Sequence, residues 1–381
     1  MNRRRILDVL KEQGALTQVE IAAVTGLSPA TVSNLVRELD TAGAVDLAPS
    51  VRNGRRATQV SLAAASGLLG AIVFGDRDIR VAIGRGDDDI LAMRRMPLAA
   101  SYVVDEQLVR ATRLLSEVVE DAGHSVPELR AMCVGIPAPI DVASQQVGDD
   151  GILPAWAGVP IVEVLQEALN TSVVLDNTAN LGALAEARVG YLRGIEQGVY
   201  LRASHGVGAG LIINGSLYRG AGGAAGEIGH LTVDENGAVC RCGNRGCLDT
   251  VVGSEAMLRV LRPTHGETIT LRDAIQRALA GDAGCARVLG DAGRHLGIAA
   301  ANLVNVLNPQ VIVVGGELAR VGELVLGPMR AAMERRAIRS AVRSVEVWST
   351  ALSPNDSDVV GALAAADEVR GSADLAALVM A

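Results

Sequence analysis

The chain has 381 residues, of which 49% are hydrophobic, and its formal net charge is −8. That length exceeds a typical single domain, so two or three domains with separate cores are predicted. A net negative charge argues against one large nucleic-acid-binding surface, but the charge is unevenly spread. Residues 1–60 contain eight Lys/Arg and six Asp/Glu, or +2, which leaves −10 for the rest. The first sixty residues are therefore the part best suited to meet DNA.

The first residues and the cysteines indicate the cellular compartment in which the protein resides. The charges of Arg3, Arg4, Arg5 and Asp8 interrupt any hydrophobic run, which argues against a secretory signal peptide. No apolar stretch of about 18 residues follows, so we expect a soluble, cytoplasmic protein with no membrane partner. The cysteines number five, and three of them fall within residues 240–247. This pattern favours a metal site in a reducing compartment over a disulfide framework.

Residues 1–64 are predicted to form a winged helix-turn-helix domain. A short amphipathic helix over residues 6–13 is followed by a second helix, in which Thr17 and Glu20 form a capping box. Gly26 suits the left-handed turn that ends this second helix. The helix lengths and the turn glycine together match helix-turn-helix spacing.

A third helix begins at Ser28, which can cap it, followed by Pro29. Apolar side chains recur along it at helical spacing and should face a small core: Val32, Leu35, Val36 and Leu39. Small, amide or basic side chains point outward and suit a helix that lies in the major groove: Ala30, Thr31, Ser33, Asn34 and Arg37. The other interpretation is a small helical bundle whose third face is merely solvated.

A two-stranded wing is predicted after the third helix, with strands over residues 44–47 and 59–62. The polar turn between them, residues 53–56, places Arg55 and Arg56 at the tip of the wing. Guanidinium groups there can enter the minor groove, where the negative potential attracts them. Taken alone, such a turn is usually only solvated surface, but beside a helix-turn-helix we interpret it as a DNA contact.

From about residue 67 the chain alternates strand-like and helical stretches, as in an α/β protein with two lobes. Strands are predicted over residues 71–74, 79–83, 131–136, 173–175, 199–201, 210–213 and 311–314, and helices over 105–121 and 292–306.

The sharpest motif in the chain combines one histidine with three cysteines. Three thiolates within eight residues, with an imidazole ten residues earlier, can close a tetrahedral Cys3His site for structural Zn2+: His230, Cys240, Cys242 and Cys247. Glycines at 243 and 246 let the backbone fold around the ion. A histidine shared with a ligand pocket could couple metal and ligand. The alternative is three unconnected thiols on a loop.

With these motifs the sequence resembles the ROK family (repressors, open reading frames, kinases) over nearly the whole chain. The resemblance rests on four segments: Glu227-Ile-Gly-His230; Cys240-x-Cys242-Gly-x-x-Gly-Cys247-Leu-Asp249; the Gly206-Val-Gly-Ala-Gly210 loop that runs into Gly220; and Asn302-Leu-Val-Asn-x-Leu-Asn308-Pro309. It implies an α/β fold in which an N-terminal winged helix-turn-helix precedes two actin-like (ribonuclease-H-like) lobes around a cleft. The implied domains are residues 1–64, 65–188 rejoined by a helix at about 357–375, and 189–356 with the zinc site and an oligomerisation surface.

The resemblance also implies a sugar site whose amides, carboxylates and imidazole hold sugar hydroxyls: Asn177, Thr178, Glu227, His230 and Asp249. Thr178 stands where the kinase-type site has an aspartate base, and a hydroxyl cannot serve as that base near neutral pH. A register shifted by one place would give Asp176 the role instead. Asp249 replaces the usual Glu, and Ala138 stands where glycine is common.

The phosphate-binding elements implied by the resemblance depart from the kinase pattern as well. The first turn of a kinase site supplies an acid for magnesium and a second glycine, whereas this chain has Val73 and Asp76, with Phe74 adding bulk. The second loop, residues 206–210, has Val207 in place of threonine, and a glycine-rich loop alone can be a simple turn. These departures indicate that the chain is not an enzyme.

The leading hypothesis is a DNA-binding regulator, most often a repressor in this family, that senses a sugar or sugar derivative without phosphorylating it. Its expected partners are an operator in double-stranded DNA, the effector, and further copies of the chain in a dimer or tetramer. The runner-up is an ATP-dependent sugar kinase with an added DNA-binding domain. The remaining candidates are interpreted as structural or surface residues: Cys133, Cys285, Trp156 (core or hinge, alternatively sugar stacking), His124, His205, His265 and His295.

Overall fold

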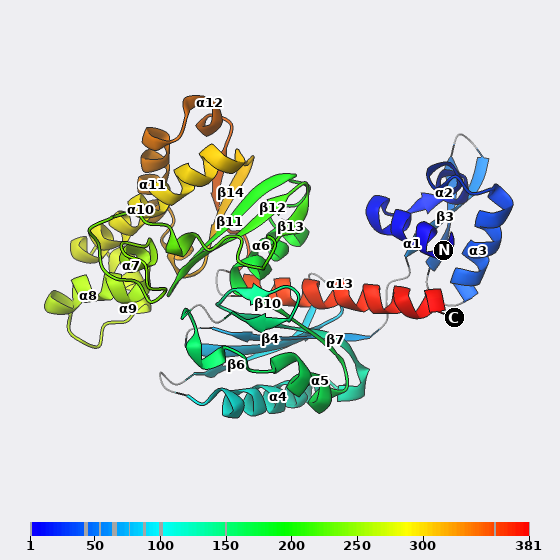
Figure 1. Ribbon diagram of the computed structural model, residues 1–381, viewed down its shortest axis with the longest axis horizontal. Coiled ribbons are helices and arrows are strands. Elements are labelled where there is room, and N and C mark those ends of the chain that lie inside the picture. Colours follow the sequence, from blue (N-terminus) through cyan, green and yellow to red (C-terminus); the bar gives the residue numbers. More distant parts are fainter. Residues whose placement is uncertain are drawn as a thin grey trace. The chain divides into compact units, whose positions relative to one another are not determined.

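The structure is a computed structural model that divides into two compact units (Figure 1). The N-terminal unit comprises Met1–Gly67 with Asp367–Ala381, and the body comprises Leu68–Ala366. The structure describes residues 2–41, 45–52, 55–62, 67–75, 77–86, 89–98, 102–148, 151–353 and 356–380; within them it leaves out the side chains of residues 4, 8, 11, 12, 51, 52, 55, 56, 62 and 371–380. The predicted boundaries between three domains stay a prediction.

Three helices and a three-stranded sheet form the N-terminal unit: α1 (Asn2–Gln13), β1 (Leu16–Thr17), α2 (Gln18–Thr25), α3 (Pro29–Thr41), β2 (Val45–Arg52) and β3 (Arg55–Leu62). The strands are antiparallel in the order β1-β3-β2. The first helix begins at Asn2, four residues before the predicted start, since the arginines that precede Ile6 are good helix formers. The wing strands are also longer than predicted, since β2 extends to Arg52 and β3 begins at Arg55.

Local capping fixes where the helices of this unit begin and end. Thr17 Oγ1 accepts the N–H of Glu20, and Glu20 Oε2 accepts the N–H of Thr17, which confirms the capping box. Gly26 has a φ of 66°, the left-handed conformation expected of it. Ser28 Oγ accepts the N–H of Thr31 at 3.1 Å and so caps α3.

The apolar residues predicted to face inward form the core of the N-terminal unit. Ile6, Leu7 and Leu10 of α1 are buried, and α3 contributes Val32, Val36 and Leu39. Val45 and Val60 add the inner face of the wing, and Leu35 is partly buried against the same cluster. The wing and the three helices therefore share one core.

The first sheet of the body has five strands in the order β10-β7-β4-β5-β6. Its strands are β4 (Leu68–Phe74), β5 (Asp78–Gly84), β6 (Ile90–Pro97), β7 (Leu129–Ile136) and β10 (Ser172–Asn177). The helices α4 (Val104–Asp121) and α5 (Ile161–Leu169) lie along one face of this sheet (Figure 1). A short hairpin, β8 (Ile140–Asp141) with β9 (Gln146–Val147), follows β7.

The second sheet repeats this architecture in the order β13-β12-β11-β14-β15. Its strands are β11 (Gln197–Ala203), β12 (Val207–Ile213), β13 (Ser216–Tyr218), β14 (Val311–Gly315) and β15 (Glu346–Ser349). Helix α6 (Thr178–Val189) precedes these strands, and the helices between β13 and β15 are α7 (Asp249–Val252), α8 (Ser254–His265), α9 (Leu271–Leu279), α10 (Ala283–Leu307), α11 (Glu323–Arg336) and α12 (Arg339–Val342).

Both sheets have the same topology. In each, the first three strands are antiparallel neighbours, the fourth strand lies parallel beside the first, and the fifth lies parallel beside the fourth. Parallel neighbours need helical crossovers, and these helices cover the sheets. The body is therefore two α/β lobes of one design, as the alternation along the sequence predicted, although the edge strands β6, β13 and β15 were not predicted.

Glycines allow α6 to lie close to the second sheet. A Cβ at Gly210 of β12 would stand 2.4 Å from Cβ of Ala183, and one at Gly182 would stand 2.2 Å from the ring of Tyr200. The approach of Ala183 explains Gly210, the last glycine of the segment at residues 206–210, which was expected to be a glycine-rich loop. From Val207 onward that segment is strand β12 and not a loop.

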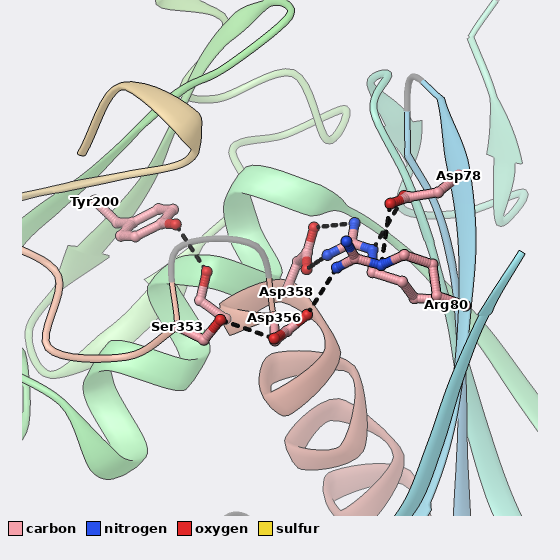
Figure 2. Close-up of polar contacts among 8 residues, drawn as sticks. Asp78, Arg80, Tyr200, Ser353, Asp356 and Asp358 are labelled. Carbon is pink, nitrogen blue, oxygen red and sulfur yellow. Dashed lines mark hydrogen bonds and ion pairs between the residues drawn. The ribbon is translucent and has the colours of Figure 1, made fainter. Parts of the chain in front are cut away.

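The last helix, α13 (Ser357–Met380), begins where the two sheets of the body meet (Figure 2). Ser357 and the hydroxyl of Tyr200 in β11 are 2.9 Å apart, and Asp358 forms an ion pair with Arg80 in β5. The start of α13 is thus bonded to a strand of each sheet.

In the described part of the chain, no individual helix has the length and apolar character needed to span a membrane. One bent pair, α2 with α3, passes by length and composition.

Candidate ligand cavity, cysteine cluster and DNA-facing helix

Asn177 lies at the junction where β10 ends and α6 begins. Its Oδ1 accepts the N–H of Ala179 at 2.7 Å and caps α6, so its Nδ2 is turned the other way. That nitrogen donates to the carbonyl of Ala138 and to Glu227 Oε1, both at 3.0 Å. Because Glu227 is fifty residues away in the sequence, this one amide connects the first lobe to the ligand residues of the second.

A small cavity of about 60 Å3 lies at this junction. All five residues predicted to hold a ligand line it: Asn177, Thr178, Glu227, His230 and Asp249. The other lining residues are Pro137, Ile152, Ala179, Arg202, Gly206, Val207, Gly208 and Arg241. A cavity of this size holds a few water molecules.

Polar groups around the cavity bond to one another in this state. Asp249 Oδ1 accepts the N–H of Val207 at 3.1 Å, and Arg241 Nη2 lies 3.7 Å from Asp249 Oδ2. Thr178 is 1% exposed, so its hydroxyl is sheltered from bulk water. Arg202 and Arg241 were not predicted as site residues. Arg241 lies inside the Cys240–Cys242 motif and could have been noticed there, whereas Arg202, at the end of β11, carries no local signal.

Asp176 points to a different partner. Its Oδ2 accepts from Arg219 Nε at 2.9 Å and Nη2 at 2.6 Å, and its Oδ1 accepts from Asn180 Nδ2 at 2.8 Å. Among the described residues that line the small cavity, Thr178 is present and Asp176 is not. The geometry therefore favours the register in which Thr178 occupies the base position.

The four residues of the Cys3His motif come together in space. Their ligand atoms all lie within 4.8 Å of one another, with Sγ of Cys242 and Cys247 at 3.8 Å, and Cys240 Sγ at 3.5 Å from His230 Nδ1. A tetrahedral zinc ion with its usual bond lengths requires about 3.8 Å between two sulfurs and about 3.6 Å between sulfur and nitrogen. The residues therefore fit a zinc ion.

Backbone turns make this cluster possible. Gly243 and Gly246 have φ values of 88° and 69°, as expected from the motif, and a Cβ at Gly246 would collide with the carbonyl of Asp234. Burial raises the pKa of the Cys247 thiol, and the neighbouring thiols raise it further. A bound cation would reverse this by stabilising the thiolate.

His230 faces both sites at once. Its Nδ1 is directed at Cys240, while its Nε2 lies 4.0 Å from Glu227 Oε2 at the wall of the small cavity. One side of the ring therefore belongs to the Cys3His cluster, and the other forms a wall of the small cavity.

A larger cavity, of about 550 Å3, lies between the lobes of the body and contains five arginines: Arg77, Arg80, Arg95, Arg202 and Arg272. The turn after β4 forms one wall of it, through Gly75 and Asp78. Val73, which stands where a kinase has its magnesium acid, is completely buried in β4. Asp76 lies outside the described residues. No carboxylate therefore stands at position 73 to hold magnesium.

Two of these arginines, Arg80 and Arg95, form ion pairs with acids (Figure 2). Arg80 forms a bidentate pair with Asp358, and Arg95 contacts both Asp78 and Asp356. Burial lowers the pKa of Arg80, but the charge and hydrogen bonds of Asp358 outweigh this and hold that pKa above its ordinary value.

Four of the remaining sequence candidates lie outside both cavities and the Cys3His cluster: Trp156, His124, His265 and His295. Trp156 is buried, and its Nε1 donates to the hydroxyl of Tyr102 at 2.8 Å, which agrees with a core role. Three histidines have nearby partners: His124 with Glu128, His295 with the carbonyl of Asp291, and His265 with Asp282 and Cys285. The contacts of His124 and His295 are local, whereas His265 meets residues 17 and 20 positions later in the sequence.

The outward face of α3 carries the side chains proposed for DNA. Ala30, Asn34 and Arg37 are exposed, and Thr31 and Ser33 are partly exposed. The backbone of Arg55 and Arg56 continues β3 to the turn of the wing, while their side chains lie outside the described residues. The helix therefore presents the residue types that base and phosphate contacts require.

Comparison with protein families gives two matches. The ROK family model matches residues 69–369, and a MarR family model matches residues 2–56. The xylose repressor of Caldicellulosiruptor bescii is 28% identical over 358 residues, which cover 88% of each chain. The glucokinase of Halalkalibacterium halodurans is 34% identical over 223 residues, 54% of this chain and 67% of that one.

Among solved structures, a ROK family transcriptional regulator that is a homologue of the Escherichia coli MLC protein matches with a TM-score of 0.80. It is 21% identical, and the match covers 99% of this chain and 98% of that one. The likeness extends to the whole fold, the N-terminal unit included.

Proposed function

Because the chain belongs to the ROK family and carries a MarR-type winged helix, we propose that it is a DNA-binding transcriptional repressor controlled by a sugar or sugar derivative. The observation that carries the proposal is the joint presence of a capped, exposed α3 and a cavity lined by all five hydroxyl-binding side chains. The similarity to a repressor over almost the whole chain supports it.

DNA would be read by α3 in the major groove and by the wing in the minor groove. Ala30, Thr31, Ser33 and Asn34 would face base edges, while Arg37 would meet a phosphate or a guanine. Arg55 and Arg56 would supply the cations at the wing tip. In a dimer, two such units can occupy successive major grooves of a symmetric operator.

The effector would bind in the small cavity. Asn177 and Glu227 hydrogen-bond each other there, and Arg241 pairs with Asp249; sugar hydroxyls can replace both contacts. Because both lobes supply walls of the cavity, a ligand bound there contacts both and can change how far they close. That movement is the step by which binding would alter the spacing of the winged helices in a dimer.

Zn2+ would be held by His230, Cys240, Cys242 and Cys247, a closed set that leaves no position for water. Its role would be structural, because it fixes the ring of His230 and with it one wall of the effector cavity. Asp249 follows Cys247 by two residues, so the loop that would hold the zinc ion would also position Asp249 for the effector.

Phosphoryl transfer is not part of this proposal. Thr178 cannot act as a general base near neutral pH, and Val73 cannot hold magnesium. A kinase bearing an extra DNA-binding domain is the second candidate, supported by the 34% identity to a glucokinase over about half of the chain.

One experiment separates the candidates. A thermal-shift screen of pentoses, hexoses and their phosphates identifies the effector by the rise in melting temperature, since a ligand that binds only the folded state stabilises it. The same compounds are then tested in a DNA mobility-shift assay on the upstream region of the chain's own gene. Release of DNA by a stabilising sugar supports the proposal. Sugar-dependent ATP turnover with no DNA binding supports the kinase.

A further inference from the structure

Three side chains outside both cavities converge where α8 ends and α10 begins. His265 is the last residue of α8, Asp282 caps the N-terminus of α10, and Cys285 is the third residue of α10. His265 Nε2 lies 3.1 Å from Asp282 Oδ2 and 3.6 Å from Cys285 Sγ, and all three ligand atoms lie within 4.8 Å of one another. An imidazole nitrogen, a carboxylate oxygen and a thiol sulfur thus point at one spot.

The spacing of these atoms matches a tetrahedral metal site. Zinc with its usual bond lengths requires about 3.6 Å between a nitrogen and a sulfur ligand, and about 3.3 Å between a nitrogen and an oxygen ligand. The observed distances from His265 Nε2 are 3.6 Å to sulfur and 3.1 Å to oxygen. Agreement is as close as in the Cys3His cluster, where the sulfur–nitrogen distance is 3.5 Å.

The surroundings orient each of the three groups. Asp282 Oδ1 accepts the N–H of Cys285 at 2.8 Å, so the helix cap uses one oxygen and leaves Oδ2 directed at His265. On the other side of the ring, His265 Nδ1 is 2.8 Å from Thr264 Oγ1 and 3.3 Å from the carbonyl of Leu261. A proton on Nδ1 satisfies these acceptors and places the lone pair on Nε2, as in histidines that bind metals.

We propose that His265, Asp282 and Cys285 form a second metal site, for zinc or a similar transition-metal ion, that is separate from the Cys3His cluster. Imidazole and thiolate ligands select such ions over magnesium or calcium. Three protein ligands leave one tetrahedral position for water. Cys285 is buried and the side chain of Asp282 is 31% exposed, so the open position faces solvent on the Asp282 side. On binding, the Cys285 thiol releases its proton to solvent and the sulfur bonds to the ion.

The position of this site gives it a structural consequence. Its ligands bracket residues 266–281, which contain α9. The N-cap of α9, Thr270, and its first two residues, Leu271 and Arg272, line the arginine-rich cavity. An ion held by both α8 and α10 would close this segment into a loop. The site therefore fixes one wall of the larger cavity, independently of the cluster that fixes the smaller one.

Metal analysis of the full chain tests the inference. Protein equilibrated with buffered zinc is expected to hold two equivalents per chain, and Cys285→Ala and His265→Gln one each. Asp282→Asn keeps the helix cap and should bind the second ion more weakly. Cys133→Ala, which removes a buried thiol from the other lobe, serves as the matched control and should retain two equivalents.

Cobalt substitution adds a second measurement that does not depend on stability. The difference spectrum between the wild type and Cys285→Ala should contain a charge-transfer band of one thiolate. Loss of one ion in Cys285→Ala and of a different one in Cys242→Ser establishes both sites. If Cys285→Ala keeps the wild-type metal content and cobalt spectrum, the three residues form only an ion pair with a neighbouring thiol, and the inference is overturned whatever happens in Cys242→Ser.

Discussion

Arg80 of β5 and Asp358 of α13 form a bidentate ion pair that is almost completely buried, with Nη1–Oδ1 and Nη2–Oδ2 distances of 2.5 and 2.8 Å (Figure 2). The two residues are 278 positions apart in the sequence. Asp358 also lies in the first turn of α13, where the helix dipole favours a negative charge. Together with the contact between Ser357 and Tyr200, the pair anchors α13 where the two lobes meet.

Removing one member of this pair should strongly destabilise the body. Arg80→Met leaves the Asp358 carboxylate buried without its counter-ion, which costs about 3–5 kcal/mol. The matched control is Arg113→Met, which breaks an exposed pair with Glu117 and should change stability by less than about 1 kcal/mol. Urea unfolding of the full chain measures both. An equal loss of unfolding free energy in the two variants would show that the buried pair contributes no more to stability than the exposed one.

The zinc cluster should be necessary for effector response. Cys242→Ser is expected to lose one zinc equivalent and the effect of the sugar on DNA binding, because the ion fixes His230 at the cavity wall. Cys133→Ala is the control and should keep both. The effect of the sugar on DNA binding is measured in a mobility-shift assay with protein of known zinc content. A normal sugar response in zinc-depleted protein would contradict the structural role.

DNA affinity should depend on Arg37. Arg37→Ala is expected to weaken operator binding and to reduce the slope of log affinity against log salt by about 1 if it contacts a phosphate. The paired change Arg55→Ala with Arg56→Ala should do the same at the wing. Arg113→Ala removes the same charge from the body and should leave affinity unchanged. Operator affinity is measured by mobility shift at several salt concentrations. If all variants bind the operator like the wild type, these arginines do not contact DNA.

The sugar response should depend on Glu227 while DNA binding does not. Glu227→Ala removes the carboxylate that holds Asn177 in the small cavity, so the inducing sugar should no longer release DNA. Operator affinity without sugar should stay within about twofold of the wild type, since α3 is untouched. Glu163→Ala, an exposed change in α5, is the control. An unaltered response in Glu227→Ala would place the effector elsewhere.

No sugar should be phosphorylated at a rate above background. Thr178→Asp alone should not restore activity, since a general base contributes about 10²- to 10⁴-fold while position 73 still lacks the magnesium acid. Transfer of radiolabelled phosphate from ATP to a panel of hexoses measures this, with a ROK glucokinase as the positive control. Activity of the wild type that depends on both sugar and ATP would decide for the kinase.

Features governed by neighbouring residues could be predicted from the sequence. The capping box of Thr17 and Glu20 and the left-handed Gly26 follow from rules that act over three or four residues. The Cys3His cluster is equally local, because its ligands lie within eighteen residues and its glycines permit the turns. The five predicted residues that line the small cavity were identified from the family resemblance. No local pattern in the sequence groups them.

Only the tertiary structure decided which distant groups meet. Nothing local in the sequence pairs Arg80 with Asp358, turns Asp176 toward Arg219, or places His265 beside Cys285, since these contacts depend on how strands and helices pack. The same holds for His230, whose two ring nitrogens face different sites. Local hydrogen bonds and turn geometry determine where elements begin and end, whereas long-range contacts form only after packing has brought the lobes together, and it is these contacts that define the chemistry of each cavity.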